Sequence, residues 1–294
     1  MNDGVDDFQQ LRPALLGLAY RMLGSMWDAQ DVVQDAWLKW TRTDRAEVRE
    51  PRAFLMTAVS RLAIDHLRLA RVKRESYRGP WLPEPVATDA LGPMDTVELR
   101  DTVSFATLTM MERLSPNERA VFVLREAFDV PYSDIAKVVD TSQQACRQLY
   151  SRAKRHLATR DARYRPSDHE VTTLLTNFMA AAQGGDLAAL SSMLADDVTA
   201  WNDGGGKVRA ATKAIVGRDR VLAFIRGLLS RYPLRDVRIV QANGQAAARL
   251  SFDGNPQFLA IDVDDGRIQG LYAVLNPDKL MRFSEPSSDV REAP

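Results

Sequence analysis

Hydrophobic positions in the first half of the chain recur with the period of an α-helix. Apolar side chains return every three to four positions in residues 11–23, and the same spacing continues through 28–40 and 51–69. This is the pattern of helices that bury one face. Ser115 followed by Pro116 is a helix N-cap with proline at the first helical position, and it predicts a further helix up to Phe128. We therefore predict that about the first 165 residues are all-α.

The pattern changes in the second half, where short strand-like segments follow the helical period of residues 171–194. Consecutive strands are separated by Asn243-Gly244, Asp253-Gly254 and Asp265-Gly266, dipeptides that favour tight hairpin turns. This half is therefore predicted to be α+β. The predicted strands are 198–201, 235–241, 246–252, 257–263 and 268–274, with a helix over 219–232.

The segment GPWLPEPVATDALGP, residues 79–93, is rich in proline and glycine. That composition forbids a continuous helix and predicts an extended linker between helical units. The whole chain has 294 residues, 45% hydrophobic and 27% charged, as in an ordinary soluble protein of several domains. Its single cysteine, Cys146, excludes an internal disulfide. No signal segment or long apolar run is visible, so we expect a cytoplasmic protein without membrane contact.

Charge is balanced over the chain, with 39 basic and 39 acidic residues, but it is distributed unevenly. Residues 61–78 hold six Lys and Arg against two acidic residues, a net of +4, and residues 147–165 hold seven against one, a net of +6. Two basic stripes in a neutral chain favour two contacts with one polyanion. Solvated helix faces are the alternative.

Residues 132–157 have the pattern of a helix-turn-helix, with two helices joined at Asp140-Thr141. In the second helix, Cys146, Leu149 and Ala153 form an apolar stripe. Glutamine and arginine can read base edges, while lysine and serine commonly hold phosphates, so the opposite face is predicted to bind DNA. The alternative is a polar hairpin without a ligand. The candidate contact residues are Gln143, Gln144, Arg147, Gln148, Ser151, Arg152 and Lys154.

Three long segments resemble regions two and four of an extracytoplasmic-function RNA polymerase sigma factor. They are LRPALLGLAYRMLGSMWDAQDVVQDAWLKW, PRAFLMTAVSRLAIDHLRLARVKR and LSPNERAVFVLREAFDVPYSDIAKVVDTSQQACRQLYSRAK. The motifs WLPEP, DGGGK and NPDKL further resemble the SigJ-like subfamily, which has a fused SnoaL-like C-terminal domain. The resemblance implies two all-α sigma domains followed by an α+β, cone-shaped domain with a curved sheet. The expected boundaries are region two in 1–75, a proline-rich linker in 76–94, region four in 95–162, the SnoaL-like domain in 168–281 and a flexible tail in 282–294.

The resemblance also assigns partners, namely promoter DNA and the clamp helices and flap of the RNA polymerase core. Gln30, Asp31, Gln34 and Asp35 would contact the core polymerase, and the helix-turn-helix would enter the −35 major groove. No cofactor or metal is expected, since the histidines lack further ligands at metal-binding spacing. The residues expected to bind the −10 element are Arg61, Asp65, His66, Arg68 and Arg71.

The stretch DGGGK, Asp203 to Lys207, lacks the GxxxxGK[ST] spacing of a phosphate loop. We predict instead an interdomain clasp in which this loop, with Gly204, Gly205 and Gly206, packs on the linker at Trp81, Leu82 and Pro83. Three glycines would let another backbone come close, and Asp203 and Lys207 would lock the contact by charge. A plain hairpin turn is the alternative.

SnoaL-like folds include polyketide cyclases, which use a buried Asp–His or carboxylate pair for proton transfer. After residue 160 the only histidine of the sequence is His169. No evident partner for proton transfer is found in the sequence for the aspartates Asp197, Asp203, Asp262 and Asp264. We therefore predict a non-catalytic, regulatory domain. The resemblance implies that this domain replaces a separate anti-sigma protein. Its pocket is a candidate site for an unidentified small molecule, and the free protein is expected to be a monomer. The alternatives are a polyketide-cyclase-like enzyme fused to a DNA-binding regulator, and a one-component repressor.

Overall fold

The computed structural model describes residues 3–91, 102–157, 166–281 and 283. The helix predicted to resume near Asp95 lies outside these residues. So do the last basic residues of the second stripe and almost all of the predicted tail, 282–294.

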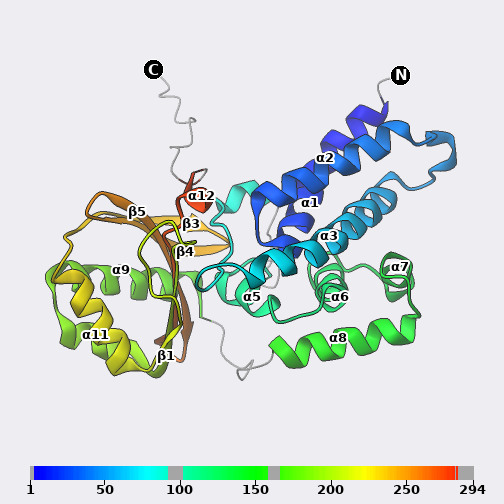
Figure 1. Ribbon diagram of the computed structural model, residues 1–294. Helices are drawn as coiled ribbons and strands as arrows, with labels where there is room; N and C mark the ends of the chain where they lie inside the picture. The colour runs from blue at the N-terminus through cyan, green and yellow to red at the C-terminus, as the bar shows by residue number, and fades with distance from the viewer. Residues whose placement is uncertain (1–2, 92–101, 158–165, 282, 284–294) are drawn as a thin grey trace, which may run out of the picture.

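The chain begins with three helices, α1 (Asp3–Leu23), α2 (Met26–Arg42) and α3 (Pro51–Glu75), that pack together (Figure 1). A single 3-10 turn, Arg45–Glu47, lies in the loop before α3. The apolar positions that carried the helical period point inward, since Leu18, Met22 and Val59 are fully buried. The predicted helical period is therefore confirmed in this part of the chain.

Among the described residues that follow, 102–157, the helices are α5 (Phe105–Met111), α6 (Pro116–Glu126), α7 (Tyr132–Val138) and α8 (Gln143–Leu157). Ser115 caps α6 as predicted, in a capping box with Glu118. Asp140 forms the turn before α8 with a φ of 53°, a left-handed conformation that aspartate tolerates. Both helical units contribute to one continuous hydrophobic core, which runs from Phe8 to Ala153.

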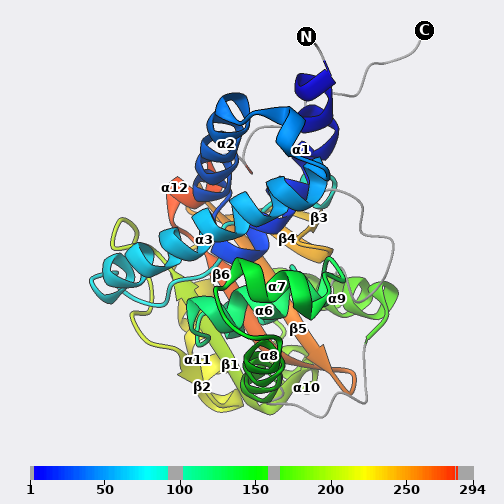
Figure 2. The ribbon, with the colours of Figure 1, turned by 90° about the vertical axis from the view of Figure 1, so that its right-hand side faces the viewer.

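The C-terminal half is a six-stranded sheet with helices on one side (Figures 1 and 2). The strand order is β2-β1-β6-β5-β4-β3; β1 and β6 are parallel and all other neighbours are antiparallel. The three predicted hairpin turns are confirmed, because both residues of each have positive φ. The elements are α9 (Asp168–Gly184), α10 (Leu187–Met193), β1 (Leu194–Asp203), β2 (Ile215–Val216), α11 (Arg218–Leu229), β3 (Leu234–Ala242), β4 (Gln245–Phe252), β5 (Asn255–Asp264), β6 (Arg267–Val274) and α12 (Pro277–Leu280).

The two faces of this sheet bury different partners, because side chains alternate along each strand. One face packs under α9 and α11, with Leu250, Ile261 and Leu271 in its core. The other face turns toward the helical half, where Phe258 packs on Phe105 of α5 with ring centroids 5.0 Å apart. The sheet therefore separates an internal pocket from the interface with the helical units.

The linker predicted from its proline content runs along this interface, forms an isolated β-bridge between Ala87 and Ala242, and then enters a 3-10 turn at Thr88–Leu91. The segment from Leu82 to Val86 is buried. The linker is therefore a packed element, held on both sides by the folded units.

Candidate functional site

The predicted recognition helix, α8, lies at the edge of the helical half, with one face on α6 and α7 and the other open (Figure 2). All seven predicted DNA-contacting side chains of this helix are exposed, while Cys146 and Ala153 are fully buried. Two of the seven form ion pairs with α6, at 3.4 Å for Arg152 with Glu118 and 3.5 Å for Lys154 with Glu126. The open face of α8 thus carries mixed glutamine and cationic side chains suited to a DNA groove.

The predicted −10 residues lie on α3, where Arg61, Asp65 and Arg68 are exposed and His66 is half-buried. The Arg61 guanidinium donates a hydrogen bond to the backbone carbonyl of Lys137 in α7, at 2.6 Å. Arg68 pairs with Asp65 at 2.9 Å within the same helix. The side chain of Arg71 lies outside the described structure. Helix α3, which is expected to bind the −10 element, is therefore in direct contact with α7, the first helix of the helix-turn-helix.

Helix α2 presents the residues expected to contact a partner protein. Asp31, Gln34 and Asp35 are exposed and Gln30 is half-buried, so all four are at the surface. Sequence reasoning missed Trp27 and Leu38, which are 45% and 42% exposed. Trp27, Asp31, Gln34 and Leu38 recur at helical spacing and form one stripe. An exposed tryptophan beside polar groups is typical of a protein interface, and only the folded helix shows that Trp27 is left outside the core.

Asp203, at the end of β1, is fully buried and bonded from three directions. Its carboxylate accepts hydrogen bonds from the Tyr77 hydroxyl at 2.6 Å and from the Leu82 backbone amide at 2.9 Å. It also pairs with the Lys279 ammonium at 2.7 Å. Lys279 in turn donates to the Leu82 carbonyl. One carboxylate therefore joins the linker, the sheet and α12.

The sequence predicts that the charges of Asp203 and Lys207 hold the loop on the linker. In the structure neither of them pairs with a charged group in the described part of the linker. Asp203 meets the linker through neutral donors, and its cation comes from α12. Lys207 pairs with Asp278 at 2.5 Å, and both side chains are exposed. The NPDKL segment thus supplies both ionic partners, Asp278 and Lys279. Sequence spacing cannot show this, since the partners are about 70 residues from the loop.

The glycine triplet allows close approach by both backbone and side chains: at Gly204 the nearest group is the backbone carbonyl of Val208 in the same loop, and at Gly205 and Gly206 it is side chains. A Cβ at Gly205 would lie 2.3 Å from the Asn276 amide nitrogen and 3.1 Å from the Tyr77 hydroxyl. Gly205 also has a φ of +60°, in the left-handed region. The Asn276 amide donates to the Tyr77 hydroxyl at 3.0 Å, across the space that a side chain at Gly205 would fill.

Trp81, the first residue of WLPEP, contacts the cationic groups of Arg74 and Lys279 and packs against Gly24. The Arg74 guanidinium is 3.7 Å and the Lys279 ammonium 4.1 Å from the ring centroid. A Cβ at Gly24, between α1 and α2, would approach the ring to 2.9 Å. Arg74 also pairs with Glu112, at the end of α5. Trp81 therefore joins the first three helices to α12, and through Arg74 to α5.

A second contact with the linker involves Asn243, in the turn between β3 and β4, which the sequence indicated only as a hairpin residue. It is fully buried and has a φ of 53°. Its side chain accepts from the Val86 amide at 3.0 Å and donates to Val103 at 3.2 Å and to the Tyr20 hydroxyl. Its backbone amide donates to Val86 at 2.9 Å. This turn thus inserts between α1, the linker and the chain before α5.

Burial shifts the pKa of two groups around Asp203. It lowers the pKa of Lys279 to about 8, and the nearby Asp203 carboxylate opposes this shift without cancelling it. Burial and the hydrogen bond to Asp203 raise the pKa of the Tyr77 hydroxyl, which stays neutral and can donate. At neutral pH Lys279 is therefore an ammonium and Tyr77 a neutral donor.

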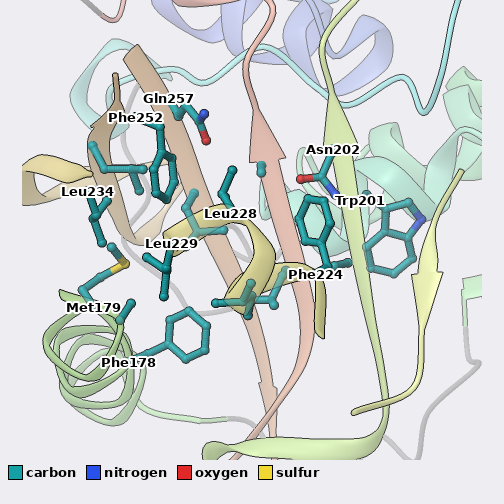
Figure 3. Close-up of a pocket in the computed structure, with 17 residues that line it drawn as sticks. Phe178, Met179, Trp201, Asn202, Phe224, Leu228, Leu229, Leu234, Phe252 and Gln257 are labelled. Atoms are coloured by element: carbon teal, nitrogen blue, oxygen red, sulfur yellow. The ribbon is translucent and has the colours of Figure 1, made fainter. Parts of the chain in front are cut away.

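The internal pocket of the sheet domain is lined by apolar side chains and two carboxamides, Asn202 and Gln257 (Figure 3). None of its lining residues is ionisable, so a general acid or base of the cyclase kind is lacking there. Among the described residues, no group of three or more His, Cys, Asp or Glu is placed to hold a metal, and no helix is long and apolar enough to span a membrane.

Three family models match consecutive parts of the chain. They are Sigma-70 region 2 over residues 8–72, Sigma-70 region 4 over 104–157 and a SnoaL-like domain over 175–273. The matches cover the helical units with α2, α3 and α8, and the sheet with the pocket. The expected order of two sigma regions and a SnoaL-like domain is therefore confirmed.

Two mycobacterial proteins are similar over nearly the full length. The ECF RNA polymerase sigma factor SigJ of Mycobacterium tuberculosis is 40% identical over 94% of this chain and 92% of its own. A probable ECF RNA polymerase sigma factor SigI of the same species is 33% identical, with 92% of both chains covered. The crystal structure of Mycobacterium tuberculosis SigJ superimposes with a TM-score of 0.77 at 37% identity, covering 94% of this chain and 98% of that one.

Proposed function

Because the chain belongs to the extracytoplasmic-function RNA polymerase sigma factors, we propose that its SnoaL-like domain regulates promoter recognition from within the same chain. The protein is a sigma factor that directs transcription initiation through the polymerase core and promoter DNA. The fused domain takes the place of a separate anti-sigma protein. The protein acts in the cytoplasm. It is a monomer when free of polymerase, so light scattering of the purified protein should give a mass near the chain's 32.9 kDa.

In this proposal each exposed helix face has one partner. The open face of α8 reads the −35 element, and the exposed side of α3 holds the −10 strand. The stripe on α2 contacts the clamp helices of the polymerase core, with Trp27 and Leu38 supplying the apolar part of that contact. Region four meets the polymerase flap.

The contact between α3 and α7 supports assigning this arrangement to the free protein. Arg61, a −10 candidate, is bonded to the backbone of the helix-turn-helix. The −35 and −10 elements are separate stretches of DNA, so the two regions must move apart to bind both. The linker between them decides how far they separate, and the SnoaL-like domain holds that linker.

The observation that carries this proposal is the position of Asp203, bonded to Tyr77, Leu82 and Lys279. Asn243 holds the linker at a second point, Val86. With both contacts formed, 76–91 follows the sheet surface and region four stays against region two. We infer that the two contacts together act as the clasp that sets the spacing of the promoter-binding regions.

The test is run-off transcription with purified core polymerase and a cognate promoter, using full-length protein. Asp203→Asn and Asn243→Gly each weaken one contact, and templates that differ in the −35 to −10 spacing report the geometry. We expect the variants to change output and to accept a wider range of spacings. Asp278→Asn, in α12, and Asp253→Gly, in the turn between β4 and β5, change exposed residues and are the controls. Unchanged output and spacing preference in both clasp variants would refute the proposal.

A further inference from the structure

The pocket of the SnoaL-like domain lies on the sheet face opposite the linker, beneath α9 and α11 (Figure 3). It has a volume of about 80 Å³. Aromatic and aliphatic side chains form its walls, among them Phe178, Phe224, Leu228 and Phe252. A pocket of this kind favours a compact apolar molecule.

Two carboxamides interrupt this apolar wall. Asn202 on β1 and Gln257 on β5 are only 7% and 9% exposed. Figure 3 shows both near the upper end of the pocket, while Phe178 and Met179 lie at the lower end. The Asn202 amide nitrogen has no hydrogen-bond partner among the described residues. A buried amide without a partner lowers stability, so such groups usually have a partner in ligand or water.

The chemistry of the lining restricts the ligand. The pocket has no charged side chain, so an ionised ligand would lose its hydration without gaining a counter-ion. A carboxamide can both donate and accept, which suits a carbonyl or a hydroxyl group. The small volume excludes long acyl chains in this conformation.

We propose that this pocket binds a compact, uncharged, mostly apolar molecule, such as a cyclic ketone, lactone or alcohol, whose oxygen meets the carboxamides of Asn202 and Gln257. The apolar body of the ligand fills the end near Phe178. The oxygen supplies the hydrogen bond that Asn202 otherwise lacks.

The proposed ligand binds at Asn202, which is adjacent to Asp203 in the sequence. The side chains of Asn202 and Asp203 lie on opposite faces of β1. A ligand that orders β1 at Asn202 therefore stabilises the strand end at which Asp203 holds Leu82. This second step, ligand control of the clasp, rests on the proposed function of the domain. Binding itself does not depend on it.

Binding is tested with a matched pair of probes, cyclohexanone and methylenecyclohexane, which share a shape and differ in the oxygen. Ligand-observed NMR titration of the full-length protein should show that cyclohexanone binds more tightly, by about tenfold. Asn202→Leu should abolish that preference and leave the melting temperature of the free protein unchanged or higher. Gln257→Leu is the second variant should Asn202→Leu not fold. Asn255→Leu, at an exposed asparagine of β5, should keep the preference.

Equal affinity for the two probes, or no detectable binding of either, would overturn the proposed site. Asp203→Asn should still bind cyclohexanone, since Asp203 faces the linker, so failure of the clasp and failure of the pocket are separable. Hydrogen exchange at the Leu82 amide tests the coupling. Cyclohexanone should slow this exchange in the wild type, and an unchanged rate with bound probe would overturn ligand control of the clasp.

Discussion

The carboxylate of Asp203 accepts a hydrogen bond from the backbone amide of Leu82 at 2.9 Å, across 121 positions of the chain. A buried carboxylate is costly unless it is paired and hydrogen-bonded, and Asp203 obtains both from the linker and α12. The energy of this one group therefore depends on three segments being in place together, so that changes at Asp203 should affect both stability and promoter choice.

Asp203→Asn should lower the free energy of unfolding by about 3 kcal/mol, because Lys279 keeps a buried charge without its partner. Urea denaturation of the full-length protein measures this. Asp278→Asn removes the exposed pair with Lys207 and should cost less than about 1 kcal/mol. Equal losses in the two variants would show that Asp203 is not the central group of this contact.

Gly205→Ala should destabilise the protein more than Gly254→Ala, although both glycines have positive φ. Each substitution costs about 1 kcal/mol for the left-handed backbone. At Gly205 the methyl group also meets Asn276, adding about 2 kcal/mol, whereas nothing lies within 4 Å at Gly254. Thermal denaturation compares the two, and matching melting temperatures would argue against close packing at the glycine triplet.

Asn243→Gly keeps the turn conformation but removes the side chain that bonds to Tyr20, Val86 and Val103. We expect a loss of about 3 kcal/mol, since the Val86 amide is left buried without its partner. Asp253→Gly likewise replaces a turn residue of positive φ by glycine, but in an exposed turn, and should be nearly neutral. If the Asn243 variant were equally neutral, the second linker contact would contribute nothing to stability.

The stability contributed by Lys279 should rise with pH between about 8 and 10.5. Its pKa is about 8 in the folded protein and 10.5 when unperturbed, so in this window the unfolded state binds more protons and rising pH favours folding. Below that window the contribution is constant. The difference in unfolding free energy between wild type and Lys279→Met, measured over this range, should therefore grow in favour of the wild type. A flat or falling difference would contradict the lowered pKa.

Arg147→Ala should weaken binding of promoter DNA carrying the −35 element by about tenfold to a hundredfold, because arginine on this face of α8 is placed to read a base edge. The Arg147 guanidinium lies 5.4 Å from the Tyr132 ring centroid, and the Arg147 side chain is exposed. Arg220→Ala removes an exposed arginine of α11 and should leave DNA affinity unchanged in an equilibrium binding assay. Equal effects would indicate that only net charge matters.

The amino-acid sequence by itself determined the features that depend on neighbouring residues. The helical period in α1, the capping box at Ser115 and the three hairpin turns all follow from interactions within a few positions. The sigma regions and the SnoaL-like domain were identified from their motifs for the same reason, since each motif is a continuous segment.

Only the tertiary structure decided which distant groups meet. Lys279 as the cation of Asp203, Asn243 as a linker contact and Asn202 as a pocket residue all depend on the order and twist of the strands. Arg61 likewise meets Lys137 through helix packing. Side-chain type and spacing restrict what each residue can bind. Its burial and its partners are set only when the whole chain has folded, because those contacts join segments that no local pattern relates.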